Sequence, residues 1–210
     1  MASLSEYVAA ACRYQEQITS GAITGGQKKA PQIALSRLLA EVIASDLAAW
    51  GMTLETGERR FIGGLAGAQI DAHEANEKDG LRVGIEIKTV NEAAGRAMWN
   101  RVNDLRSFAV NFHWKFPFAV LGGFIAIPNH IPGEPNLSGL VQRVGEVLER
   151  VNGRPNEAAP GHLLEGACLL VYDCGTRELD PSLPTAASRL RYNDFLELVG
   201  QAYRARFFMQ

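Results

Sequence analysis

A β-hairpin predicted over residues 67–90, GAQIDAHEANEKDGLRVGIEIKTV, constrains the fold of this chain more than any other segment. Strand-forming residues flank Asp79-Gly80, a dipeptide that favours a two-residue turn. Side chains alternate between the two faces of a strand, so Asp71, Glu86 and Lys88 are expected on one face. The opposite, buried face is expected to carry Ile70, Ile85 and Ile87.

Two registers of this hairpin are compatible with the sequence. With Asp79-Gly80 as the turn, Asp71 lies opposite Lys88, whereas a loop centred one residue earlier places Asp71 opposite Glu86. Both registers keep the three charged groups on one face. Two carboxylates and an ammonium group on a hydrophobic hairpin are suited to metal-assisted cleavage of a phosphodiester. The plainer alternative is a solvated strand face with cross-strand ion pairs.

Asp71, followed after a short hairpin by Glu86-Ile87-Lys88, resembles the motif of the PD-(D/E)XK nuclease superfamily, which includes most type II restriction endonucleases. Ile70 stands in place of the motif's proline, which takes no part in the chemistry. The resemblance implies that Asp71, Glu86 and the backbone carbonyl of Ile87 bind Mg²⁺, with Mn²⁺ as a substitute. It also implies that Lys88 contacts the scissile phosphate and orients or activates the attacking water. Mg²⁺ prefers oxygen ligands and usually takes one or two carboxylates while keeping several waters.

Hydrophobic periodicity outside the hairpin predicts an α/β fold. Helices are expected over 31–50, 96–113, 137–151 and 193–208, and strands over 53–62, 68–75, 82–90, 118–127 and 166–172. Their order is similar to the restriction-endonuclease-like core (α-β-β-β-α-β), a central mixed sheet flanked by helices. We therefore expect a single nuclease domain over residues 1–210, with its core at about 31–128. Residues 129–210 are expected to complete the fold and to supply dimer contacts and sequence readout. This part includes the last helix, with Phe195, Leu196, Val199 and Tyr203.

Glu41 is a further candidate carboxylate, on the first helix of the predicted core. Some members of the superfamily carry a glutamate on this helix that supports the metal site, with a glycine at the helix end, and Gly51 occupies that place here. A rotation of about 100° per residue puts Glu41 off the apolar face of the helix. A solvent-exposed Glu41 is therefore the favoured alternative.

Candidate DNA contacts lie around the hairpin. Asn100 and Arg101 resemble the Asn-Arg helices that follow the E-x-K strand in some restriction enzymes, and a guanidinium group matches phosphate oxygens well. An intrahelical ion pair is the alternative for Arg101. Lys28 and Lys29 form a basic segment that either clamps DNA or is a solvated linker. His73 shares the predicted face of the charged groups and is expected either in the cleft or at the surface.

Composition sets outer limits on the class of protein. The chain has 210 residues, of which 47% are hydrophobic and 21% charged, as in an ordinary globular domain. No run approaches the roughly 20 apolar residues that span a bilayer, and the N-terminal residues do not resemble a signal peptide. Cys12, Cys168 and Cys174 show neither close pairs nor metal-ligand spacing, so we expect reduced thiols and a cytoplasmic location.

These observations together favour a Mg²⁺-dependent endonuclease acting on double-stranded DNA. A sequence-specific type II restriction endonuclease is the leading form. It would act as a homodimer, and a DNA methyltransferase that modifies the same site can accompany such an enzyme. The alternatives are a structure-specific repair, recombination or phage nuclease and a non-catalytic DNA-binding module. The net charge of −2 argues mildly against non-specific binding of nucleic acid, and motifs for nucleotide hydrolysis, serine hydrolysis or zinc proteolysis are absent.

Overall fold

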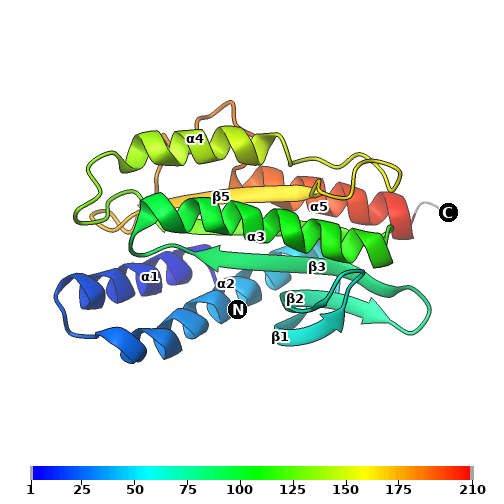
Figure 1. Cartoon of the computed structure of the whole chain (residues 1–210), viewed down its shortest axis with the longest axis horizontal. Coiled ribbons are helices and arrows are strands. Elements are labelled where there is room, and N and C mark those ends of the chain that lie inside the picture. Colours follow the sequence, from blue (N-terminus) through cyan, green and yellow to red (C-terminus); the bar gives the residue numbers. More distant parts are fainter. Residues whose placement is uncertain (1, 209–210) are drawn as a thin grey trace.

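The computed structural model describes residues 2–208 and shows a mixed six-stranded sheet with helices on both faces (Figure 1). The strand order is β1-β2-β3-β4-β5-β6. β1, β2 and β3 pair antiparallel, β3, β4 and β5 pair parallel, and β6 returns antiparallel to β5. The strands are β1 Glu55–Ile62, β2 Gly67–Asn76, β3 Gly80–Thr89, β4 Val120–Pro128, β5 Gly166–Asp173 and β6 Glu178–Leu179. The expected α/β class and the mixed sheet flanked by helices are confirmed.

In the described part of the chain, five α-helices cover the sheet: α1 Leu4–Thr19, α2 Lys29–Leu47, α3 Ala94–Lys115, α4 Leu137–Glu149 and α5 Tyr192–Phe207. Two 3₁₀ turns, η1 Gly25–Lys28 and η2 Ala48–Trp50, flank α2. α1, α2 and α5 pack on one face and α3 and α4 on the other, which divides the buried hydrophobic residues into two clusters (Figure 1). The predicted order of helix, three strands, helix and strand is present from α2 to β4.

Helix α1 was not predicted, although the sequence carries a signal for its start. Ser3 caps the helix, because its hydroxyl accepts from the Glu6 amide at 3.2 Å while the Glu6 carboxylate accepts from the Ser3 amide at 2.7 Å. This reciprocal pair is a capping box. Tyr7, Val8 and Ala11 then bury one face of α1 in the core.

Helix α5 contributes to the interior of the fold. Phe195, Val199 and Tyr203 are buried in the cluster that α5 shares with α1 and α2. These side chains are therefore core residues of one chain, and the prediction that they make dimer contacts is wrong. The hydrophobic spacing that predicted the helix cannot distinguish a face buried within the chain from one buried against a partner.

The turn of the hairpin differs from the prediction. Asn76 pairs with Gly80, so the loop comprises residues 77–79 and Gly80 already belongs to β3. Gly80 has a φ of 70°, a left-handed conformation that glycine adopts without steric cost. Asp79-Gly80 as a two-residue turn is therefore wrong. The β2–β3 pairing then changes register between Glu74 and Ala75.

Beyond that shift the strands adopt the second predicted register. Ala72 pairs with Ile85, and continuing this register places Asp71 opposite Glu86. Ile85 belongs to the cluster under α2, as expected, but Ile70 packs in the cluster on the α3 side. The shared face predicted for the isoleucines is wrong for Ile70, which lies beside an irregularity in the β1–β2 pairing. Bulges of this kind increase local twist.

Close contact between β4 and its neighbours depends on glycine. A Cβ atom added to Gly122 would lie 2.6 Å from the Ile85 side chain and 2.9 Å from Phe195. These distances are shorter than carbon atoms tolerate, so the position admits no side chain without movement of the core. The pair Gly122-Gly123 therefore marks close packing within a buried strand.

The cysteines differ from expectation as well. Cys12 in α1 and Cys174 after β5 form a disulfide with a Cα–Cα distance of 5.1 Å, while Cys168 is free and buried. The two partners are 162 residues apart in sequence, so their spacing gave no sign of the pair. The expectation of three unpaired thiols is wrong. Among the described helices, none has both the length and the apolar character needed to cross a membrane.

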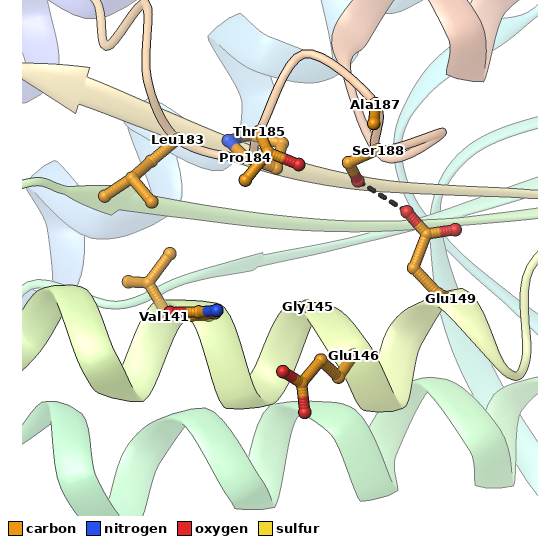
Figure 2. Close-up of a pocket in the computed structure, with 10 residues that line it drawn as sticks. Val141, Gly145, Glu146, Glu149, Leu183, Pro184, Thr185, Ala187 and Ser188 are labelled. Carbon is orange, nitrogen blue, oxygen red and sulfur yellow. Dashed lines mark hydrogen bonds between the residues drawn. The ribbon is translucent and has the colours of Figure 1, made fainter.

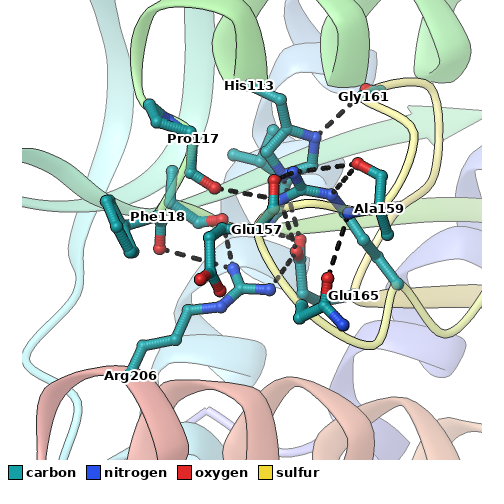
Figure 3. A network of polar contacts seen from close by, with 12 residues as sticks. His113, Pro117, Phe118, Glu157, Ala159, Gly161, Glu165 and Arg206 are labelled. Carbon is teal, nitrogen blue, oxygen red and sulfur yellow. Dashed lines mark hydrogen bonds and ion pairs between the residues drawn. The ribbon is translucent and has the colours of Figure 1, made fainter.

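A buried carboxylate, Glu165, connects several elements at the amino-terminal ends of β4 and β5 (Figure 3). It accepts from Arg206 at 2.6 Å, Arg154 at 3.2 Å and the Leu121 amide at 2.7 Å, and it lies 3.2 Å from His113. Burial alone would raise the pKa of Glu165, but the hydrogen bond and charge of His113, together with Arg206 and the Leu121 amide, lower it. The network joins α3, α5 and the loop before β5.

We expect Glu165→Gln to destabilise the protein by about 3–5 kcal/mol, because the buried Arg154 would lose its anionic partner. Urea unfolding at pH 7 measures this change, with Glu146→Gln on the exposed face of α4 as control. A lowered carboxylate pKa contributes stability above the unfolded-state pKa, and that contribution is lost as pH falls through the folded-state pKa. The difference from wild type should therefore shrink in acid. Equal stability of both variants at pH 7 would contradict this role for Glu165.

Candidate functional site

The candidate site begins where β2 and β3 separate. Their pairing ends at Ala72 and Ile85, and beyond that point the Ile87 amide donates to the Asp71 carboxylate at 2.7 Å. A side chain thus takes the place of a strand partner. The N–H and C=O groups of one strand residue point to the same edge, so the Ile87 carbonyl faces this gap as well.

The gap belongs to a cleft of about 560 Å³. The cleft is bordered by α2, β1, β2, β3 and α3, so segments far apart in the sequence meet there. Its lining consists of Lys29, Gln32, Ile33, Ser36, Glu58, Gln69, Asp71, Ile87, Lys88, Thr89 and Arg101. Five of the predicted site residues belong to this lining: Lys29, Asp71, Ile87, Lys88 and Arg101.

Glu86 is connected to the charged residues of the cleft by an ion pair with Lys88. The Lys88 ammonium donates to the Glu86 carboxylate, and the two side chains are only 23% and 13% exposed. Glu86 does not line the open part of the cleft, but its charge interacts with those of Asp71 and of Asp104 on α3. The structure therefore brings Asp71, Glu86 and Lys88 together.

Burial and nearby negative charges disfavour the ionised forms of Asp71 and Glu86. Burial, and then the charges of Asp71 and Asp104, raise the pKa of Glu86 to about 7 against the opposing effect of Lys88. Burial and the charge of Glu58 raise the pKa of Asp71, although the Ile87 amide and Lys88 act in the other direction. Partly buried carboxylates that repel one another are stabilised by a cation placed between them.

The donor set fits a Mg²⁺ ion bound partly through water. Asp71 Oδ1 and Glu86 Oε2 take no part in the hydrogen bonds described above, and the Ile87 carbonyl faces the same gap. Within residues 2–208, no three His, Cys, Asp or Glu side chains are close enough together to hold a metal alone. Mg²⁺ does not need such a cage, since it keeps several waters and takes one or two carboxylates.

Glu41 lies outside the cleft. Its carboxylate accepts from Arg37, one turn earlier in α2, at 3.1 Å, and the Glu41 side chain is 40% exposed. The cleft side of α2 is formed instead by Gln32 and Ser36. The favoured alternative, a solvated Glu41, agrees with this position.

His73 is buried in the fold and does not line the cleft. Its ring packs edge-on against Phe61, with ring centres 4.9 Å apart, and Nε2 lies 3.4 Å from the Glu55 carboxylate. Burial lowers the pKa of His73. Neither the cleft position nor the surface position expected from the sequence is correct.

The remaining predicted DNA contacts are divided. Lys28 is held by Glu92 at 2.6 Å, whereas its neighbour Lys29 lines the cleft. Arg101 lines the cleft while donating to Asp104 at 2.7 Å, so the predicted intrahelical ion pair is present, whereas the phosphate contact stays a prediction. Asn100 is exposed on α3, outside the lining of the cleft.

Glu58 is the site residue that the sequence interpretation missed. It lies on β1, lines the cleft and is close enough to raise the pKa of Asp71. Its position depends on an irregularity at Gly57, which has a φ of 112°. A glycine inside a strand pattern often marks a bulge, and that was the available sign.

A second cavity of about 330 Å³ lies between α4 and the loop at residues 183–188 (Figure 2). Glu146 and Glu149 are the charged residues of its lining, and the Ser188 hydroxyl donates to Glu149 across it. The lining contains no basic side chain. This cavity is therefore less suited to a phosphate than the cleft beside Lys88.

We expect the free energy of unfolding, measured in EDTA, to fall by up to about 3 kcal/mol between pH 4.5 and pH 7 because of Glu86. Its unfolded carboxyl ionises near pH 4.5 and its folded carboxyl near pH 7, so over this range the folded state holds more protons and loses stability as pH rises. Urea titrations of wild type and Glu86→Gln across this range measure the effect. Parallel curves for the two proteins would contradict it, and Glu77→Gln in the hairpin loop is the control expected to follow wild type.

Comparison with family models, curated proteins and solved structures finds no match for this chain. The resemblance carried by Asp71 and by Glu86-Ile87-Lys88 therefore stands on these residues, on the contacts of Ile87 with Asp71 and of Lys88 with Glu86, and on the order of the elements around them.

Proposed function

We propose that this protein is a Mg²⁺-dependent endonuclease that hydrolyses phosphodiester bonds in double-stranded DNA, built on the PD-(D/E)XK nuclease core. The observation that carries the proposal is the meeting of Asp71, Glu86 and Lys88 where β2 and β3 separate. An ion pair on a solvated strand would not need partial burial or a backbone amide directed at one carboxylate. Both features are present.

The chain's own groups divide the work of hydrolysis. Asp71, Glu86 and the Ile87 carbonyl would hold the cation, which lowers the pKa of its bound water and neutralises charge on the phosphate. Lys88, whose ammonium lies among these carboxylates, would donate to a phosphate oxygen and hold the attacking water in line. The hydrogen bond from the Ile87 amide holds the Asp71 carboxylate in place before substrate binds.

Positive charge around the cleft supports a phosphate-bearing substrate. Lys29 on α2 and Arg101 on α3 line the cleft beside Lys88, although the whole chain is slightly acidic. These groups would hold phosphates next to the scissile one, with the Arg101 guanidinium fixed in place by Asp104. Positive charge gathered at the site offsets the unfavourable net charge of the chain.

A sequence-specific type II restriction endonuclease is the form of this activity that we propose first. It would act as a homodimer on a two-fold symmetric site, in the cytoplasm, with a DNA methyltransferase protecting the same sequence. A structure-specific repair, recombination or phage nuclease would use the same cleft. A non-catalytic DNA-binding module would not require Lys88 among the carboxylates.

We expect the purified protein to cut large, sequence-diverse DNA into discrete fragments with Mg²⁺ and not with EDTA. Lys88→Ala should slow cleavage by roughly 10²-fold or more, because a charge directed at the developing phosphate charge is lost. Lys78→Ala, in the exposed hairpin loop, is the matched control and should cut like wild type. Gel analysis of fragments from methylated and unmethylated DNA, with circular dichroism of each variant, makes the measurement.

The pattern of products separates the candidates. Discrete fragments support restriction, whereas a smear or a preference for branched DNA supports a repair or recombination nuclease. Metal-independent binding without cleavage supports the binding module. Cleavage that survives Lys88→Ala in a folded protein would remove this cleft as the catalytic centre.

A further inference from the structure

Strand β1 contains a β-bulge directly beside Asp71. The pairs on either side of it are Thr56 with Ala72 and Arg59 with Ile70. Two residues of β1, Gly57 and Glu58, therefore oppose the single residue Asp71 of β2. Gly57 has a φ of 112°, which L side chains rarely adopt, so the sequence provides a glycine where the bulge requires one.

The bulge places Glu58, an exposed residue, at the border of the cleft. Glu58 lines the cleft together with Asp71, and its charge is among those that raise the pKa of Asp71. Nothing in the described part of the chain offers Glu58 a hydrogen bond or an ion pair. By contrast, Glu55 on the same strand lies 3.6 Å from Arg59.

We propose that Glu58 is a further carboxylate of the cation site, acting beside Asp71 through water bound to the ion and not as a direct ligand. The inference rests on the proposed function, since the cation is the one that function requires. Lys88 engages Glu86, whereas Glu58 lies on the β1 side of Asp71 and lines the same cleft. A cation bound by Asp71 would relieve the repulsion between these two carboxylates, and its bound waters can donate to Glu58.

A plainer role for Glu58 is protection of an edge strand, because charged side chains on an edge discourage pairing with other chains. The two roles differ in their consequences. If Glu58 only protects the edge, neutralising it leaves the cation affinity unchanged. If Glu58 belongs to the cation site, neutralising it lowers the cation affinity.

The test is Mn²⁺ binding to the DNA-free protein, followed by electron paramagnetic resonance and calorimetry. Glu58→Gln should weaken Mn²⁺ affinity by about tenfold, in the range found when groups around a metal are removed. Glu77→Gln removes an exposed carboxylate from the hairpin loop and should bind Mn²⁺ like wild type. Asp71→Asn should bind Mn²⁺ far more weakly than either.

The outcomes separate this inference from the proposed function. If Asp71→Asn weakens Mn²⁺ binding and Glu58→Gln matches Glu77→Gln, the role of Glu58 is overturned while the cation site stands. If wild type and Asp71→Asn bind Mn²⁺ equally poorly, the cation site and the proposed function fail together. Loss of affinity in Glu58→Gln, with unchanged circular dichroism, supports the proposal.

Discussion

The hydrogen bond from the Ile87 amide to the Asp71 carboxylate is the interaction on which the site depends. A buried amide must find an acceptor, and here the acceptor is a side chain because β2 has already diverged from β3. The divergence opens the sheet enough for α2 and α3 to contribute residues to one cleft. The same bond fixes Asp71 near Lys88, so backbone geometry and site chemistry share one cause.

The charges of the cleft form an unbalanced set. Asp71 interacts electrostatically with Lys88 and Glu58, and Glu86 with Lys88, Asp71 and Asp104, and the pKa values of Asp71 and Glu86 are both raised. Such repulsion lowers stability in the absence of a ligand and is relieved by binding a cation. Functional sites are often maintained at this kind of energetic cost.

Strand periodicity was sufficient to predict the central group of the site. Glu86 and Lys88 share a face because they are two residues apart on one strand, and Asp71 joins them because it lies opposite Glu86. The two predicted registers place Asp71 two residues apart on the partner strand, so both keep this face. Strand periodicity failed where the backbone departs from regularity, and the bulge at Gly57 therefore hid Glu58. The prediction for His73 was wrong because strand alternation assigns a side chain to a face of the sheet but does not show whether that face is exposed or covered.

Elements joined by distant contacts were less predictable. The capping box at Ser3 marks the start of α1, but only packing shows which surface the helix covers. The Cys12–Cys174 pair and the network at Glu165 join segments far apart in the chain, and one sequence carries no record of such proximity. Helix periodicity likewise predicted α5 without showing that its apolar face is used internally.

The two margins of the sheet bear on how copies of the chain could associate. One margin is β1, interrupted by its bulge, and the other is β6, which has only two residues, Glu178 and Leu179. Neither presents a long, regular row of free amide and carbonyl groups to a second chain. Intermolecular strand addition is therefore disfavoured at both margins. An assembly with two-fold symmetry would have to be built from helix surfaces and loops, leaving each sheet complete within its own protomer.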